Sequence, residues 1–122
     1  MIIKGSNEPL VMLVTPDCVT AKFGSVTVQD GGGILHQWLR YPAETDSSGN
    51  ILKLGRDDIY TVKADYSHTV CECEWDQEDT VKLPVGPVKI VAKFRDANGN
   101  VLHSRTIYDI VSDCGDETIL GG

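Results

Sequence analysis

Two cysteines and a histidine are the side chains in this sequence most suited to binding a metal. Cys71 and Cys73 flank Glu72, and His68 lies shortly before them. Thiolates and imidazoles are zinc ligands, but zinc sites usually present C-x₂-C knuckles in turns. A C-x-C pair on a strand points both thiols into the same face of a sheet, where free cysteines are commonly buried. We therefore expect Cys71 and Cys73 to be core thiols, with no bound metal.

Carboxylates and amides form two further groups. Asp96, Asn98 and Asn100 resemble the start of a calcium loop, but the later ligands and the closing glutamate of an EF-hand are missing. Asn98-Gly99 between two alternating runs predicts a hairpin turn instead. The second group indicates a solvated acidic edge rather than a catalytic carboxylate pair, and it consists of Glu72, Glu74, Asp76, Glu78 and Asp79.

The remaining candidates give no catalytic pattern. The sequence contains no G-x-S-x-G elbow, no phosphate-binding P-loop and no H-E-x-x-H motif. Trp38 and Trp75 could stack on a sugar, but in alternating runs they are more often core or subunit contacts. We therefore expect a protein that is not an enzyme and uses no cofactor.

Length and charge further limit the possible functions of the chain. At 122 residues the chain fits one domain, and its formal net charge of −7 argues against a nucleic-acid or anionic-membrane partner. The first residues do not form a signal peptide, and no apolar run approaches the length of a membrane span. We expect a cytoplasmic origin, with Cys18 and Cys114 reduced like the other two cysteines.

Period-2 alternation and turn residues predict an antiparallel β-sandwich of about seven strands, spanning residues 1–122 as one domain. A short arm is expected over residues 1–8 and a tail over residues 113–122. Residues 42–50 read as an exposed loop, and residues 76–80 as a polar corner or one helical turn. The predicted strands are residues 10–14, 19–30, 34–41, 59–64, 70–75, 88–95 and 101–111, with residues 51–54 either a strand or a turn of helix.

Three strands carry more detailed expectations. The continuous apolar run 10–14 suits a strand buried on both faces, or a docked edge strand. In the strand 88–95 we expect Val88, Ile90, Ala92 and Phe94 to face the core. The apolar residues of 101–111 change parity, which predicts a bulge or twist near Arg105.

Several short segments of the chain together form a recognisable set, of which the corner Gln77-Glu-Asp-Thr80 is the most specific. The others are Met1–Gly5 with Pro9, Val26–Gln29, Trp75, Val81–Leu83, Gly86, Val88–Ile90, Asn98-Gly99 and Ser104. In these segments the chain resembles a family of small proteins encoded by phages and prophages of Firmicutes, and it is similar to the immunoglobulin-like N-terminal domain of siphophage upper baseplate proteins. Residues 40–57 depart from the family by a longer connection.

The resemblance implies an immunoglobulin-like sandwich and a non-enzymatic virion protein, assembled in the bacterial cytoplasm. Its place would be a tail, baseplate or neck, where it would contact other phage structural proteins as a homo-oligomer in a symmetric assembly. A capsid decoration protein bound to the major capsid protein is the first alternative, and a carbohydrate- or protein-binding module is the second. The residues expected to make protein contacts are Ile2, Ile3, Leu10, Val11, Met12, Trp38 and Tyr41, partly because an extended arm can add to a neighbouring sheet.

Overall fold

Alternating side chains build an all-β sandwich, which a computed structural model describes for residues 1–65 and 67–113. Seven of its strands have at least five residues, which agrees with the predicted number. They are Leu10–Val14 (β2), Phe23–Asp30 (β3), Gly33–Tyr41 (β4), Ile59–Lys63 (β8), Thr69–Cys73 (β9), Gly86–Arg95 (β10) and Val101–Ser112 (β11). The shorter elements are Ile2–Ile3 (β1), Glu44–Thr45 (β5), Ile51–Lys53 (β6), Arg56–Asp57 (β7), the 3₁₀ turn Pro16–Thr20 (η1) and the helix Gln77–Val81 (α1).

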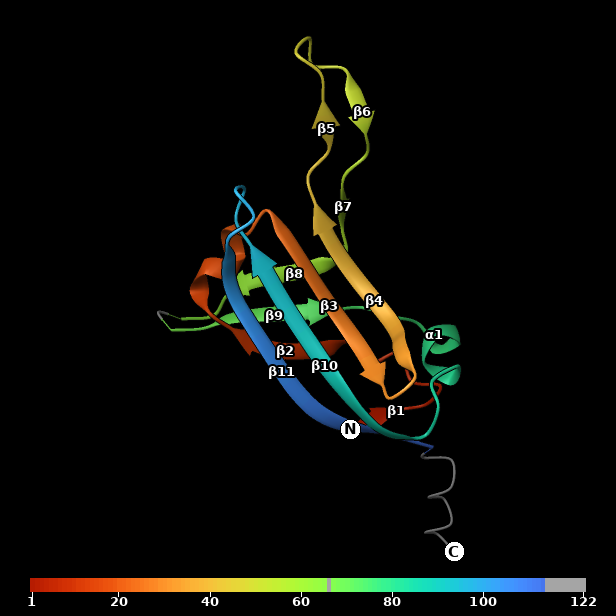
Figure 1. Cartoon of the computed structure of the whole chain (residues 1–122). Helices are drawn as coiled ribbons and strands as arrows, with labels where there is room; N and C mark the ends of the chain where they lie inside the picture. Colours follow the sequence, from red (N-terminus) through yellow and green to blue (C-terminus); the bar gives the residue numbers. More distant parts are fainter. Residues whose placement is uncertain (66, 114–122) are drawn as a thin grey trace, which may run out of the picture.

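The strands form two packed sheets and one separate hairpin. The larger sheet has the order β1-β11-β10-β3-β4-β7, and the smaller has the order β2-β9-β8. Figure 1 shows the small sheet crossing behind the large one at a steep angle, while β5 and β6 project beyond both. Within the described residues, no helix is long and apolar enough to cross a membrane.

The core lies between the two sheets, where alternation was clearest in the sequence. On β10, Val88, Ile90, Ala92 and Phe94 are buried as predicted, and Lys89 and Lys93 of the opposite face are not. Burying a large aliphatic or aromatic side chain stabilises the fold by about 1.5–3 kcal/mol. The facing sheet contributes Met12, Ile59, Cys71 and Cys73, and Trp75 is also buried.

Two predicted turns are confirmed. Asp96 accepts hydrogen bonds through Oδ1 from the N–H groups of Asn98 and Asn100, both at 2.9 Å, and Gly99 has a φ of +85° that favours glycine. The polar corner is the single helical turn α1. Asp76 and Asp79 cap it reciprocally, with each side chain accepting from the other's N–H.

The N-terminal segment departs from the predicted short arm. Ile2 and Ile3 form β1, which pairs in parallel with Val111 and Ser112, so the sandwich is not wholly antiparallel. Trp75 Nε1 donates to the carbonyl of Glu8 at 2.8 Å. Because a buried Ile2 and these backbone contacts hold the segment to the body, residues 1–8 are part of the domain.

Two strand predictions are corrected in detail. Leu10, Met12 and Val14 are buried, whereas Val11 and Leu13 are exposed, so β2 is buried on one face only. In β11 the register shifts near the start of the strand, where Phe94 pairs with residue 103 and Arg95 with residue 101. The predicted parity change is therefore real, but it lies at residue 102 rather than near Arg105.

The sandwich is confirmed, but its immunoglobulin-like character is not. In an immunoglobulin constant domain the second strand lies in the sheet opposite the third, sixth and seventh strands. Here the second long strand, β3, lies in one sheet with the third, sixth and seventh, β4, β10 and β11. The predicted tail over residues 113–122 falls outside the described residues except for Asp113.

Candidate protein-interaction site

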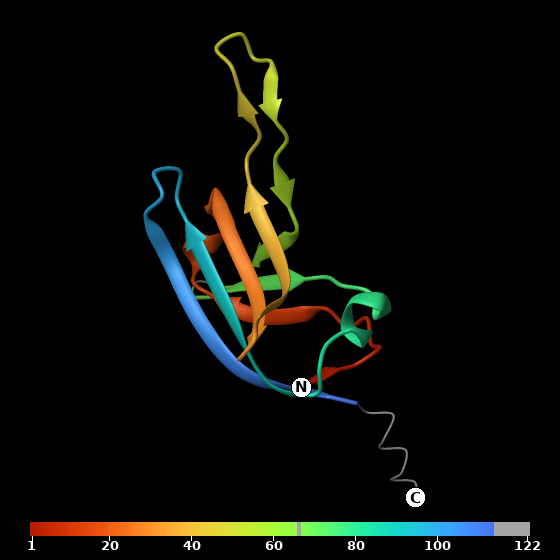
Figure 2. The same ribbon diagram turned by 45° about the vertical axis from the view of Figure 1, so that its right-hand side comes forward.

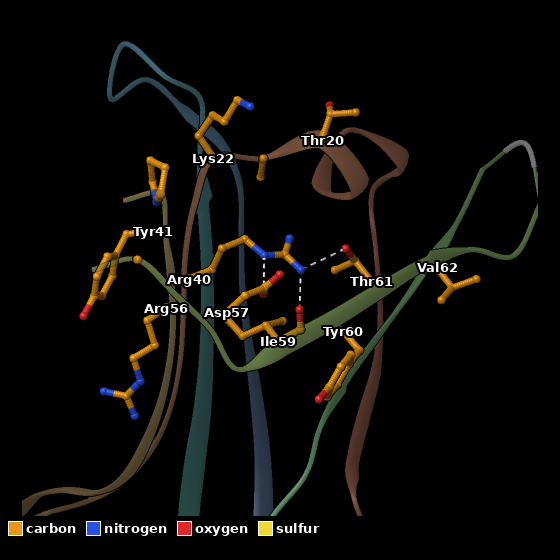
Figure 3. A pocket seen from close by; sticks show the side chains of 13 residues that line it. Thr20, Lys22, Arg40, Tyr41, Arg56, Asp57, Ile59, Tyr60, Thr61 and Val62 are labelled. Carbon is orange, nitrogen blue, oxygen red and sulfur yellow. Dashed lines mark hydrogen bonds and ion pairs between the residues drawn. The ribbon is translucent and has the colours of Figure 1, made fainter. Parts of the chain in front are cut away.

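A hollow of about 880 Å³ opens where the edges of the two sheets meet, at the base of the hairpin that carries β5 and β6. Figure 3 shows it from close by. Its walls come from four segments, which are residues 20–22, 40–42, 55–57 and 59–62. The first begins with the last residue of η1, the second contains the end of β4, the third includes β7 and the fourth belongs to β8.

Arg40 occupies the centre of this hollow and is only 12% exposed. Its Nε donates to Asp57 Oδ1 at 2.8 Å, and its Nη1 donates to the carbonyl of Cys18 at 3.4 Å. Its Nη2 donates to the hydroxyl of Thr61 at 3.2 Å and to the carbonyl of Ile59. The dashed lines of Figure 3 show the bonds to Asp57, Ile59 and Thr61.

The position of Arg40 follows from the alternation of β4. Trp38 points into the core, so the residue two positions on points between the sheets as well. There the long side chain bridges β4 to β8, which is an edge strand of the smaller sheet. Four of its five N–H donors are engaged by the protein itself, so Arg40 joins the two sheets and has little capacity left to bind a ligand.

The hairpin that projects above the hollow, residues 42–55, is built by a recognisable turn. Asp46 Oδ1 accepts from the N–H groups of Ser48 and Asn50 at 2.9 Å, and Gly49 has a φ of +87°. The hydrogen bonds from Asn50 hold the pKa of Asp46 below its usual value. The same pattern closes the loop from Asp96 to Asn100, so the D-x-x-G-N repeat was a signal for a hairpin that the sequence reading missed.

The two segments at the base of the projecting hairpin approach each other so closely that only glycine fits at position 55. A Cβ at this position would lie 2.6 Å from the backbone nitrogen of Ala43 and 2.8 Å from the carbonyl oxygen of Tyr41. Beside it, the ammonium of Lys53 lies 5.5 Å from the centroid of the Tyr41 ring, a cation–π contact. These contacts set the direction in which the projecting hairpin leaves the sandwich (Figure 2).

The projecting hairpin carries three large apolar side chains that the rest of the described chain does not cover. Ile51, Leu52 and Leu54 are 61%, 69% and 73% exposed. Two isolated strands are at best marginally stable in water, and β5 and β6 are only two and three residues long. Exposed apolar groups on such an element are typical of a surface that becomes covered by a partner.

A second apolar surface covers the outer face of the three-stranded sheet. The register places Leu13 beside Val70 and Val70 beside Val62, which forms one row across β2, β9 and β8. Val11 and Tyr60 lie in the neighbouring row, on either side of Glu72, and both are more than half exposed. This face was missed because the sequence predicts only that the strand 59–64 alternates, without showing which side is buried.

The residues predicted to make protein contacts fall into two groups. Ile3 and Tyr41 are half-buried at the surface, and Val11 is exposed. The other four pack inside the domain, so their side chains are not displayed to a neighbour, and they are Ile2, Leu10, Met12 and Trp38. Trp38 Nε1 also donates to the carbonyl of Glu74 at 2.7 Å, which leaves it no free polar group. The predicted contacts of Ile3, Val11 and Tyr41 remain predictions.

The cysteines considered above as metal ligands lie in the core of the fold. Cys71 and Cys73 are fully buried, and the hydrogen bond with Cys71, together with burial, raises the pKa of the Cys73 thiol. Burial likewise raises the pKa of Cys18, so the thiols of Cys18 and Cys73 are protonated at neutral pH, whereas the hydrogen bond with Cys73 lowers the pKa of Cys71. Among the residues that the structure describes, no three His, Cys, Asp or Glu side chains are arranged to hold a metal ion.

No protein-family model, no curated protein and no solved structure matches this chain. The candidate site therefore depends on geometry alone, and the resemblance to phage baseplate domains remains a prediction.

Proposed function

We propose that this chain is a non-enzymatic structural protein of a bacteriophage virion, which binds neighbouring proteins through its projecting hairpin. The observation that carries this proposal is the exposure of Ile51, Leu52 and Leu54 on an element that has almost no support from the sandwich. A hairpin of this kind gains stability when a partner buries its apolar side chains. The resemblance supplies the kind of partner, which is another phage structural protein of the tail, baseplate or neck.

The electrostatics and the hollow agree with a binding role. A net charge of −7 disfavours contacts with nucleic acid or anionic lipid and leaves protein surfaces as partners. The central cation of the hollow, Arg40, is committed to the fold, so the hollow offers no free catalytic group at its centre. Both tryptophans are buried, so neither offers the stacking platform that a sugar-binding module could use.

The test is the presence of the chain in purified particles. Particles induced from a host that carries the encoding element should contain the chain in stoichiometric amounts after density-gradient purification. Separated heads and tails then distinguish a tail location from capsid decoration. Absence of the chain from intact particles would refute the proposal.

The projecting hairpin is tested by a triple substitution, Ile51→Ser, Leu52→Ser and Leu54→Ser. We expect incorporation into particles to fall at least tenfold, because the contact loses its apolar side chains. The matched control is Val101→Ser, which removes an apolar side chain that is 50% exposed at the start of β11, outside the projecting hairpin. Equal incorporation of the triple variant and the control would show that the hairpin is not the contact.

A further inference from the structure

Strand β11 has a long free edge. Its partner on that side, β1, pairs only with Val111 and Ser112. The carbonyl of Ser112 accepts from Lys4 N at 3.0 Å, so the backbone groups of Ser112 point away from β10. Backbone groups alternate in direction along a strand, and the pairing with β10 is unbroken from Val111 to His103. The N–H and C=O groups of residues 104, 106, 108 and 110 therefore point away from β10 as well.

One of these residues confirms the direction. The N–H of Ile110 is accepted by the carboxylate of its neighbour Asp109 at 2.7 Å, which is impossible for a group bonded to β10. Within the described residues, the outward backbone groups of Ser104, Thr106 and Tyr108 have no such partner. Figures 1 and 2 both show β11 as the outermost long strand of its sheet.

The other sheet edges are shorter, partly covered or irregular. The edge strands β8 and β2 have five residues each, and arginines donate to the carbonyl of Ile59 on β8 and of Leu13 on β2. On the far side of the large sheet, β7 pairs only with Arg40 and Tyr41, so residues 33–38 of β4 have no strand partner there among the described residues. The register of that stretch is broken by an irregularity opposite Val28 and Gln29, whereas the edge of β11 is continuous from residue 104 to 110. Natural proteins usually shorten or cover the edges of their sheets, because a long unpaired edge is a template for another strand.

We propose that β11 pairs in antiparallel orientation with β11 of a second copy of this chain, about a twofold axis at Thr106. In this register Thr106 faces its own copy, and Ser104 faces Tyr108 of the second copy. Every outward group of these residues then finds a partner, since opposed residues in such positions exchange both of their hydrogen bonds. The contact is the same patch on both subunits, as twofold symmetry requires.

The same register brings side chains of compatible character together. It places His103 directly opposite Asp109 of the second copy, where directly opposed residues have Cβ atoms about 5 Å apart. Within each copy, Asp109 Oδ1 already lies 2.9 Å from the N-terminal ammonium of Met1 and accepts from the N–H of Ile110. The imidazole would therefore lie beside a paired carboxylate and not beside a second cation. This inference rests on the proposed symmetric assembly and names the surface that joins its copies.

Disulfide trapping tests the register. In a Cys114→Ser background, Thr106→Cys should form an intermolecular disulfide under mild oxidation, because the two Cα atoms lie about 5.5 Å apart, within disulfide range. Tyr108→Cys is the matched control, since its two copies lie about 14 Å apart along the strands. Cys18, Cys71 and Cys73 are buried and do not compete. Equal cross-linking of both variants would overturn the register.

The mass in solution tests the dimer itself. The full chain should show twice its 13.3 kDa mass by light scattering. Thr106→Pro removes an outward N–H, which an edge strand tolerates, and should give a folded monomer by circular dichroism. Thr106→Val keeps the N–H and should remain a dimer. A monomeric wild-type protein at all concentrations would refute the pairing and would leave the virion proposal standing, whereas absence from particles would refute that proposal and leave the dimer intact.

Discussion

Replacing Arg40 by methionine should separate the two sheets more than any other change at the hollow. Methionine keeps most of the apolar stem but removes every donor of the guanidinium. The carbonyls of Cys18 and Ile59 and the hydroxyl of Thr61 then lose their charged partner, in a place where Arg40 is only 12% exposed. Water can reach this hollow only in part, so the lost hydrogen bonds are incompletely replaced.

The expected magnitude follows from these contacts. A hydrogen bond to a charged group contributes about 1.5–3 kcal/mol, and an exposed ion pair such as that with Asp57 adds at most about 1 kcal/mol. Because the carbonyl of Cys18 lies at 3.4 Å, its bond is weak, and we expect a total loss of about 3–5 kcal/mol. A chain of this length loses about 4 °C in Tm for each kcal/mol, so Arg40→Met should melt about 12–20 °C lower.

Thermal unfolding followed by circular dichroism measures this loss, with two variants for comparison. Arg56→Met changes an arginine of the same hollow that is 49% exposed and pairs only with Asp58 in the described chain, so it should cost less than about 4 °C. Arg40→Lys keeps the charge but not the planar fork and should fall between them. If Arg40→Met melts within about 4 °C of the wild type, Arg40 does not hold the sheets together.

Three further predictions concern other parts of the fold. Gly55→Ala should lower the free energy of unfolding by about 1–3 kcal/mol, because the added Cβ pushes the base of the projecting hairpin apart. Hydrogen exchange should become faster in residues 42–55 but not in β10, and unchanged exchange would contradict this. Trp38→Phe removes the partly buried hydrogen bond from Trp38 Nε1 to the carbonyl of Glu74, so urea unfolding should show a loss of about 0.5–1.5 kcal/mol, and an unchanged midpoint would contradict it. Burial, with a smaller contribution from Arg105, lowers the pKa of His103 in the folded protein. The contribution of the neutral imidazole to the free energy of unfolding is therefore present above the unfolded pKa of 6.5, and it is lost as the pH falls through the lower native value. In the monomeric Thr106→Pro background, Tm should therefore fall further from pH 7.5 to 5.5 than it does when His103→Gln is added; parallel curves would show that His103 is not responsible.

The parts of the fold that sequence predicted are those where one face of a strand is apolar and the other polar. Val88 to Phe94 on β10 and the pair Cys71 and Cys73 are examples, because a period of two leaves one assignment of the inner face. Asn98-Gly99 predicted a turn for a similarly local reason, since few residues tolerate its backbone conformation.

Most of the candidate site could not be predicted from the sequence, for the opposite reason. Residues 10–14 and Tyr60 with Val62 are apolar on faces that the fold leaves outside, so periodicity alone could not distinguish core from surface. The role of Arg40 depends on Ile59 and Thr61, which are brought to it only by the packing of two sheets. The parallel pairing of β1 also lies beyond local pattern, because it joins distant segments.

That last pairing has a consequence for how the protein is made. Ile2 is synthesised before every other strand of this domain, whereas its strand partner Val111 belongs to the last described strand, β11. The apolar N-terminal segment must therefore wait through translation before β1 can pair, and long-range pairings of this kind slow folding because loop closure precedes the gain from contacts. During that interval Ile2 is exposed, so the nascent chain is most prone to aggregation before β11 emerges and closes the sheet.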